Sequence, residues 1–181
     1  MKRIFLVRHC AAAGQQPDAP LSEEGVRQSK KMAELLRKFD VEYIVSSPYK
    51  RAIESVRPLS EITGVDTAID HRLRERVLSS KPLDDWMDCL KKSFEDLDMK
   101  YEGGESSREA MSRGIQVIED SIARPEQSIV VASHGGLLSL MIKHFNPNFG
   151  FQEWRQLTNP DVFLLKWEDS GLPSVERLVS D

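Results

Sequence analysis

The chain has 181 residues, of which 40% are hydrophobic and 30% are charged, and its net charge at pH 7 is −4. These values fit one globular domain and argue against a broad nucleic-acid-binding surface, which needs clustered lysine and arginine. No apolar run approaches the ~20 residues that cross a bilayer, and the first apolar run does not have the form of a signal peptide. The two cysteines make no disulfide framework. We therefore expect a cytoplasmic protein without membrane contact.

The first forty-five residues contain two apolar runs separated by an amphipathic stretch. Residues 4–7 are bulky and apolar, which is typical of a buried strand, and a second run of this kind covers residues 41–45. Between them, Ser22 is followed by two acidic residues, which predicts a helix N-cap and first turn. Apolar residues at helical spacing then continue to about Asp40. This part of the chain therefore predicts a strand, a helix and a second strand.

The middle of the chain is less regular. A helix is expected over residues 50–63, with Pro58 kinking or splitting it, and a weak strand over residues 67–69. Residues 79–104 form the least regular region and contain an amphipathic stretch over residues 82–97. We expect this region to be a lid or an insert within a single domain.

The last third returns to alternating helices and strands. Ser106 begins a Ser-x-x-Glu capping box, which predicts a helix to about residue 123. A strand over residues 128–132 and a helix over residues 135–145 follow. Two final strands, over residues 161–167 and 174–179, are close enough along the chain to pair antiparallel. The whole order predicts a three-layer α/β/α sandwich with a mostly parallel mixed sheet.

Four polar segments follow the carboxyl ends of predicted strands: Arg8-His9, residues 47–52, residues 73–75 and residues 133–135. In a parallel sheet these ends share one edge, where open α/β folds bind ligands. The segments would therefore bring two histidines, two or three arginines and one carboxylate into one site.

Such a set of groups suits the transfer of a phosphoryl group to an imidazole. Arginine is always charged and matches the oxygens of a phosphate with a planar fork of donors. A neutral histidine can attack phosphorus without first losing a proton, because its ordinary pKa is ~6.5. A carboxylic acid can then give a proton to the leaving alkoxide.

Along nearly its whole length the chain resembles the histidine phosphatase superfamily, in the branch that contains the phosphoglycerate mutases. The resemblance is carried by the order and spacing of six segments: Phe5-Leu6-Val7-Arg8-His9, Leu21-Ser22-Glu23-Glu24-Gly25, Ser46-Ser47-Pro48-Tyr49-Lys50-Arg51-Ala52, Leu73-Arg74-Glu75, Gly103-Gly104-Glu105-Ser106 and Ser133-His134-Gly135-Gly136. It implies a phosphoglycerate mutase-like α/β fold over residues 1–181.

The resemblance also implies roles for single residues. His9 matches the nucleophile that becomes phosphohistidine, and Glu75 matches the proton donor. The cationic pocket that binds the phosphoryl group matches Arg8, Arg51 and His134. No metal and no other cofactor is implied. A small phosphomonoester is the expected partner, and the oligomeric state stays open.

Two positions depart from the family pattern, which usually continues Arg-His-Gly-Glu. Cys10 stands in place of a glycine that allows close backbone approach, so we expect it to narrow or reshape the pocket. Ala11 stands in place of the acid, which bears on the substrate class. Gln15 falls where many members carry an asparagine that contacts phosphate. Arg74 and Arg76 flank Glu75 and are further candidates for substrate contacts.

The function expected from these observations is hydrolysis of a small phosphorylated metabolite by a metal-independent histidine phosphatase. A phosphoglycerate mutase-type phosphotransferase is one alternative, although such mutases are usually longer. A non-catalytic module that binds a phosphorylated ligand is another. Cysteine-based phosphatases use a Cys-x5-Arg loop, in which the arginine binds the phosphate and lowers the pKa of the thiol. Here the residue at the arginine position after Cys10 is Gln16, so this class is rejected.

Overall fold

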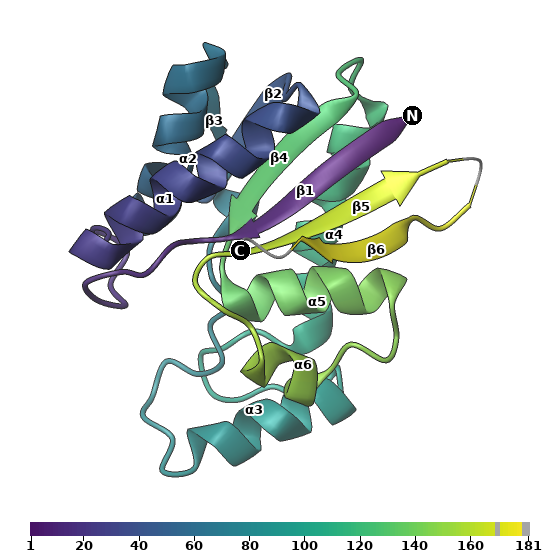
Figure 1. Ribbon diagram of the computed structural model, residues 1–181. Coiled ribbons are helices and arrows are strands. Elements are labelled where there is room, and N and C mark those ends of the chain that lie inside the picture. Colours follow the sequence, from purple (N-terminus) through teal and green to yellow (C-terminus); the bar gives the residue numbers. More distant parts are fainter. Residues whose placement is uncertain (169–170, 179–181) are drawn as a thin grey trace.

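The computed structural model describes residues 1–168 and 171–178, which form a twisted mixed sheet with helices on both faces (Figure 1). The order of the six strands across the sheet is β3-β2-β4-β1-β5-β6. The strands are β1 (Lys2–Arg8), β2 (Tyr43–Ser46), β3 (Thr67–Ile69), β4 (Ser128–Ser133), β5 (Asp161–Trp167) and β6 (Ser174–Leu178). The first four run parallel, and β5 and β6 are antiparallel to their neighbours. Val179, expected at the end of the last strand, lies outside the described residues.

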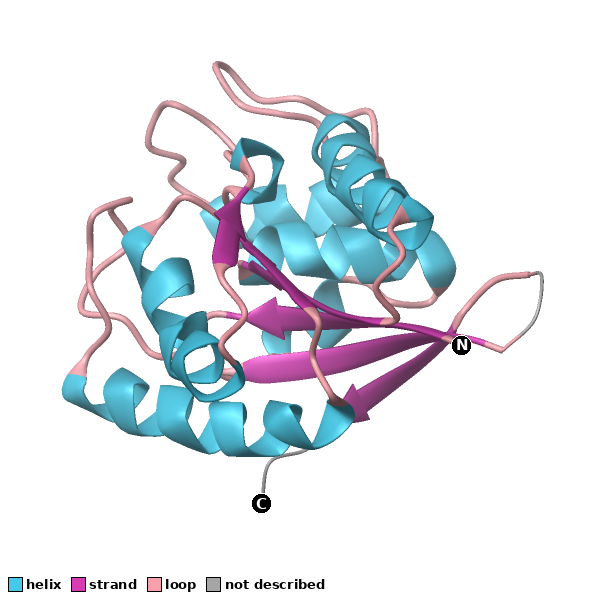
Figure 2. Cartoon of the chain, turned by 90° about the horizontal axis from the view of Figure 1, so that it is seen from above, coloured by secondary structure: helices cyan, strands magenta, loops and turns pink. Residues whose placement is uncertain are grey.

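Helices cover both faces of the sheet, as Figure 2 shows. One face is covered by α1 (Glu23–Leu36) and α2 (Lys50–Thr63), and the other by α4 (Ser107–Ala123) and α5 (Gly135–Phe145). The shorter helices α3 (Trp86–Glu95) and α6 (Phe151–Arg155) lie beyond α5, away from the sheet (Figure 1). The expected three-layer α/β/α sandwich with a mostly parallel mixed sheet is confirmed.

The central strand β1 is buried on both faces, which explains its uninterrupted apolar sequence. Because side chains alternate along a strand, Phe5 and Val7 pack under α1 and α2, whereas Ile4 and Leu6 pack under α4 and α5. All four side chains are fully buried. The strand that carries the Arg8-His9 pair at its end is therefore held from both sides.

Local sequence signals account for the starts of α1 and α4. The Ser22 side chain accepts a hydrogen bond from the Gly25 N–H at 3.1 Å and begins α1. α1 ends at Leu36 and continues as a 3-10 turn, Arg37–Phe39. The capping box at Ser106 is formed in both directions and begins α4. These signals work because each supplies a partner for backbone groups that a helix end leaves free.

Two expectations were incomplete. Pro58 lies inside α2 without splitting it, because Val56 and Leu59 on either side of it are buried and anchor the helix to the sheet. The helix α6 was not expected, since five residues are too few to establish a helical period. Across the described ranges, we find no helix with the length and apolar character that crossing a membrane requires.

The region over residues 79–104 folds back on itself. The Ser80 N–H donates to the Glu102 carbonyl oxygen at 2.9 Å, and the Glu105 N–H donates to that of Val77 at 2.8 Å. A Cβ at Gly104 would lie 2.1 Å from the carbonyl oxygen of Leu78, so this close approach requires a glycine. α3 then packs on α6 through aromatic pairs. The role of this region as a lid stays a prediction.

Gly25 of α1 leaves no room for a side chain. A Cβ there would lie 1.9 Å from the carbonyl oxygen of Ala11, which already accepts the Ser22 N–H at 3.0 Å. We expect Gly25→Ala to lower the free energy of unfolding by about 1–3 kcal/mol, because either the helix or the loop must move. Urea denaturation measures this change. The control is Gly171→Ala, where a Cβ meets nothing within 4 Å; equal stability of the two variants would contradict the prediction.

Candidate active site

The two strand-end histidines meet because β1 and β4 pair in parallel, with Arg8 opposite Ser133. His9 and His134 follow these paired residues directly, and the His9 N–H donates to the Ser133 carbonyl oxygen at 3.1 Å. The ring centroids of the two histidines are 5.2 Å apart, with an angle of 59° between the ring planes. The structure therefore places both imidazoles at one point of the sheet edge.

Hydrogen bonds define which nitrogen of His9 is free to react. Nδ1 lies 2.7 Å from the Cys10 carbonyl oxygen. Because a carbonyl oxygen only accepts, Nδ1 carries the hydrogen and Nε2 keeps its lone pair. The Nε–H of Arg51 points at this lone pair over 3.2 Å. The Asn159 amide also donates to the His9 carbonyl oxygen at 2.8 Å and fixes the backbone. The ring is thus oriented with Nε2 as the nucleophilic atom.

Burial keeps both imidazoles neutral. It lowers the pKa of His9 from 6.5 to about 4; the hydrogen bond to Cys10 opposes this shift, and the charges of Arg51 and Arg8 add to it. Burial also lowers the pKa of His134 well below its ordinary value, with smaller contributions from His9 and Arg51. A neutral His9 is a competent nucleophile near pH 7. In the protein without a bound phosphoryl group, His134 is thus a neutral hydrogen-bonding ring beside His9.

The protonation of His9 gives a test in the free protein. We expect the ring signals of His9 in NMR spectra to titrate with a midpoint near pH 4 rather than 6.5. Since the unfolded chain binds this proton at the ordinary pKa, the stability that neutral His9 contributes is complete above pH 6.5 and lost as the pH falls towards 4. A His9 midpoint near 6.5 would show that the ring is solvated rather than buried.

Arg51 is held by the loop that follows β1. It lies in the first turn of α2, is 2% exposed, and donates from one terminal nitrogen to the carbonyl oxygens of Gln15 and Gln16 at 3.1 and 2.9 Å. Its guanidinium carbon lies 5.1 Å from the ring centroid of Tyr49. Gln15 thus contributes its backbone to the position of Arg51, and its side chain is exposed at the cleft.

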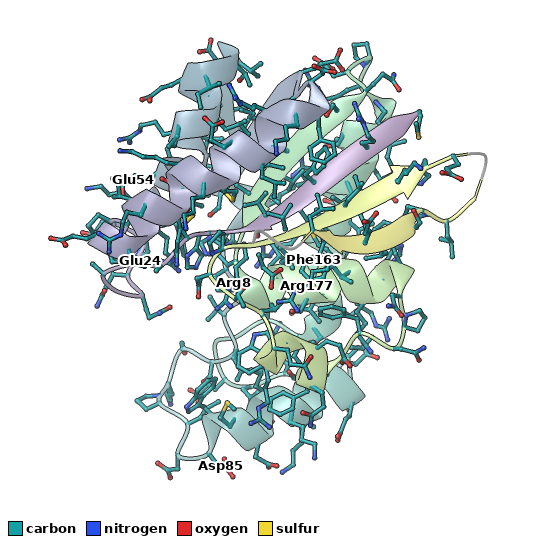
Figure 3. All side chains as sticks on the ribbon, in the orientation of Figure 1. Arg8, Glu24, Glu54, Asp85, Phe163 and Arg177 are labelled. Atoms are coloured by element: carbon teal, nitrogen blue, oxygen red, sulfur yellow. The ribbon has the colours of Figure 1, made fainter. Side chains whose placement is uncertain are left out.

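Arg8 lies where β1 ends, beside the start of α5 (Figure 3). One terminal nitrogen donates to the carbonyl oxygens of Leu157 and Thr158 at 3.1 and 3.2 Å. A Cβ at Gly135 would approach Nε of Arg8 to 3.0 Å, so the guanidinium packs directly over this glycine. The first glycine of the Ser-His-Gly-Gly segment therefore makes room for a cation beside the two imidazoles.

His134 is anchored from the neighbouring strand. Because Ser46 of β2 is paired with Ala132 of β4, Ser47 reaches the end of β4. Its hydroxyl lies 2.8 Å from Nε2 of His134. The Tyr49 ring meets the His134 ring edge-on, with centroids 4.9 Å apart. The polar segment after β2 thus supplies support for His134 as well as Arg51.

Glu75 is brought to the same edge and bound at the N-terminus of α5. Its carboxylate accepts backbone hydrogen bonds from Gly136 at 3.0 Å, Leu137 at 2.9 Å and Arg76 at 2.7 Å. A Cβ at Gly136 would lie 2.7 Å from Oε1. The second glycine of the Ser-His-Gly-Gly segment therefore allows this carboxylate to approach the helix.

Arg113 of α4 holds the segment that carries Glu75, a role that sequence reasoning missed. Its guanidinium binds both carboxylate oxygens of Glu105, at 2.7 and 2.9 Å. It also donates to the carbonyl oxygens of Arg72, Arg74 (2.9 Å) and Glu75 (3.4 Å). Because these acceptors are backbone atoms, no pattern of side chains marks the interaction. The conspicuous Gly-Gly-Glu-Ser segment, which contains Glu105, was the one signal available.

A cleft of about 400 Å³ adjoins these groups. It is large enough for a small metabolite. Its walls combine cationic, acidic and apolar side chains: Gln15, Tyr49, Arg51, Glu75, Arg76, Val77, Leu78, Ser79, Lys81, Leu83 and Trp86. A phosphoryl group near His9 would thus have the rest of its substrate in this cleft.

Cys10 does not reshape the pocket, contrary to expectation. Its side chain is fully buried in the apolar cluster beneath α1 and α2, with Val7, Leu21 and Val56, and it does not line the cleft. Burial raises the pKa of its thiol to about 11. The replacement of glycine is accommodated because this side chain lies in the core and not at the cleft.

The two cysteines should therefore differ in reactivity. We expect iodoacetamide to modify the partly exposed Cys89 in the native protein and to leave Cys10 unmodified, with phosphate release unchanged. Mass spectrometry of the peptides, together with an activity assay of the same sample, measures both effects. Loss of turnover in step with Cys10 modification would contradict this expectation.

Known proteins are similar to this chain in sequence and in fold. The model of the histidine phosphatase superfamily (branch 1) matches residues 4–180. A probable phosphoglycerate mutase GpmB from Enterobacter sp. (strain 638) is 28% identical over 94% of this chain and 87% of that protein. A glucosyl-3-phosphoglycerate phosphatase from Mycobacterium tuberculosis is 29% identical over 70% of this chain and 64% of that protein. The solved structure of the mycobacterial glucosyl-3-phosphoglycerate phosphatase with inorganic phosphate superposes with a TM-score of 0.78 at 25% identity, over 99% of this chain and 96% of that one.

The match of the family model is nearly as long as the chain itself. It includes both strand-end histidines and the segments that carry Arg51 and Glu75. The similarity in sequence and the similarity in fold extend over the same residues. The chain belongs to the histidine phosphatase superfamily, branch 1.

Proposed function

We propose that this protein is a phosphomonoester hydrolase that needs no metal and acts through a phosphohistidine on His9. The observation that carries this proposal is the arrangement of His9: a buried neutral ring whose Nε2 lone pair faces Arg51 at 3.2 Å, next to a second imidazole. Convergent cations and an oriented nucleophile are what phosphate-monoester hydrolysis requires.

In the first step, Nε2 of His9 forms a bond to phosphorus as the bond from phosphorus to the leaving oxygen breaks. Glu75 gives its proton to that oxygen, and the alcohol leaves. Water then attacks phosphorus, the bond to His9 breaks, and Glu75 takes the proton from the water. Arg8, Arg51 and His134 bind the phosphoryl oxygens throughout, with Gln15 at the mouth of the pocket.

The substrate in this proposal is a small phosphorylated metabolite. The cleft is large enough for such a molecule, and one relative is a mycobacterial glucosyl-3-phosphoglycerate phosphatase. We further place the protein in the cytoplasm, which agrees with its two free cysteines. The region over residues 79–104, which supplies Lys81, Leu83 and Trp86 to the cleft, would act as the lid or insert that selects the substrate.

A panel of phosphomonoesters, assayed for phosphate release in the presence of a chelator, tests this function. The panel combines p-nitrophenyl phosphate with sugar phosphates, phosphoserine and phosphoglycerates. We expect release from at least one ester that chelation does not reduce and that His9→Ala abolishes. Absence of release from every ester would overturn the hydrolase and favour a non-catalytic module that binds a phosphorylated ligand.

A mutase remains the second candidate, because one relative is named as a probable phosphoglycerate mutase. A mutase keeps the phosphoryl group on the protein and returns it to another hydroxyl of the substrate. Incubation with 3-phosphoglycerate, followed by NMR of phosphorus, separates the two functions. Formation of the 2-phospho isomer without free phosphate would support the mutase, whereas free phosphate alone supports the phosphatase.

A further inference from the structure

Three buried side-chain nitrogens within residues 1–168 and 171–178 have no hydrogen-bond partner: Nε of Arg8, Nδ1 of His134 and Nε of Arg76. The first two belong to the pocket that binds the phosphoryl group in the proposed function. The third belongs to Arg76, which has no part in that chemistry but lines the adjoining cleft together with Arg51 and Glu75. Since buried polar groups are normally paired, such atoms call for a ligand or another explanation.

Arg76 is also a buried cation that forms no ion pair with a carboxylate. Among the arginines that the structure describes, only Arg51 and Arg76 are buried, at 2% and 8% exposure, and neither forms an ion pair. By contrast, ion pairs to carboxylates are made by Arg27, Arg37, Arg72, Arg108, Arg113, Arg124 and Arg177. Burying a charge without a partner is unfavourable, so its presence at the wall of a cleft points to an anion from outside the chain.

The carboxylates nearest to Arg76 in the fold are bound by other groups. Glu75 accepts its hydrogen bonds from backbone N–H groups, and the carboxylate of Glu105 is bound by both donors of Arg113. The guanidinium of Arg76 is held by neutral atoms instead. It donates to the Ser93 hydroxyl at 2.8 Å and to the Glu105 carbonyl oxygen at 3.3 Å. It is thus fixed in position with donors to spare.

We propose that Arg76 binds a carboxylate on the alcohol part of the substrate, so that the protein selects phosphomonoesters whose leaving group is negatively charged. This inference rests on the proposed phosphatase function. A carboxylate suits the position better than a second phosphoryl group, because one guanidinium with some of its donors in use matches a single charge. The pocket at His9, by contrast, gathers two arginines and two imidazoles for a dianion.

The proposal is tested with two substrates of nearly equal size, 3-phosphoglycerate and glycerol 3-phosphate, which differ by a carboxylate in place of a hydroxymethyl group. We expect kcat/KM to favour 3-phosphoglycerate by about 10- to 100-fold in the natural protein, since hydrogen bonds to charged groups are of that strength. Arg76→Gln should remove the preference and change kcat/KM for glycerol 3-phosphate by less than about 3-fold. Arg76→Lys should keep part of the preference.

The matched control is Arg57→Gln, which removes an exposed cation of α2 that does not line the cleft. This variant should leave the preference intact. Equal kcat/KM values for the two esters in the natural protein would overturn the proposal. So would an Arg76→Gln variant whose kcat/KM falls by the same factor for both esters. If glucose 1,6-bisphosphate were preferred to both, the second anion would be a phosphoryl group, which also overturns it.

A binding measurement keeps the inference independent of turnover and of the folding of the variant. Calorimetry on the natural protein compares 4-phosphonobutyrate with butylphosphonate, neither of which can be hydrolysed. The carboxylate should lower Kd by about 10-fold or more. Equal Kd values would overturn the subsite. If neither 3-phosphoglycerate nor any other ester releases phosphate, the phosphatase proposal fails, and these Kd values still decide for or against the role of Arg76.

Discussion

Replacing His9 with alanine should lower phosphate release from every substrate by at least about 10³-fold, because the reaction loses its nucleophile. Among the residues that the structure describes, no other side chain takes that place: the Cys10 thiol lies in the core, and the Ser47 hydroxyl is engaged with His134. Steady-state kinetics with the best ester of the panel measures the change. Thermal unfolding of the variant shows that the fold persists.

The matched control for this variant is His144→Ala, which removes an exposed histidine from the last turn of α5. It should keep the activity of the natural protein. If His9→Ala retained more than about a tenth of that activity, another group would have to form the bond to phosphorus.

Replacing Glu75 with glutamine should have an effect that depends on the leaving group. Release of an alkyl alcohol needs a proton, so kcat/KM for an alkyl phosphate should fall by about 10²- to 10⁴-fold. Release of p-nitrophenolate needs little help, so the loss with p-nitrophenyl phosphate should be much smaller. The ratio of the two losses is the measurement.

The ratio also separates proton donation from a structural role. Glutamine would turn an amide group towards the N–H groups of Gly136 and Leu137, which now donate to the carboxylate, and this would disturb the start of α5. A purely structural disturbance lowers kcat/KM for both substrates by the same factor. Equal losses would therefore contradict the assignment of Glu75 as the proton donor.

The sequence was sufficient to predict the layers of the fold and the meeting of the two histidines. Each histidine ends an apolar run, and parallel pairing of the two runs places both rings at one edge. The capping signals at Ser22 and Ser106 predicted the starts of α1 and α4, because they act within a few residues. Local chemistry and strand periodicity are visible in a single sequence.

Other features depend on contacts between distant parts of the chain. Arg113 and Asn159 act on backbone carbonyl groups, which leave no pattern in the sequence. The direction of Cys10 could not be deduced, because the alternation of side chains ends where β1 ends at Arg8. The neutral state of His134 follows from burial, which depends on how Ser47 and Tyr49 close over the ring.

The identity of the atom that receives the phosphoryl group can be measured directly. A substrate labelled with radioactive phosphorus is mixed with the protein, quenched within milliseconds, and the labelled peptide is identified. We expect a label that is stable to alkali and labile to acid, as for a bond from phosphorus to nitrogen, on the peptide that contains His9. Steady turnover without such a label, or a label on a serine or cysteine, would contradict nucleophilic attack by His9.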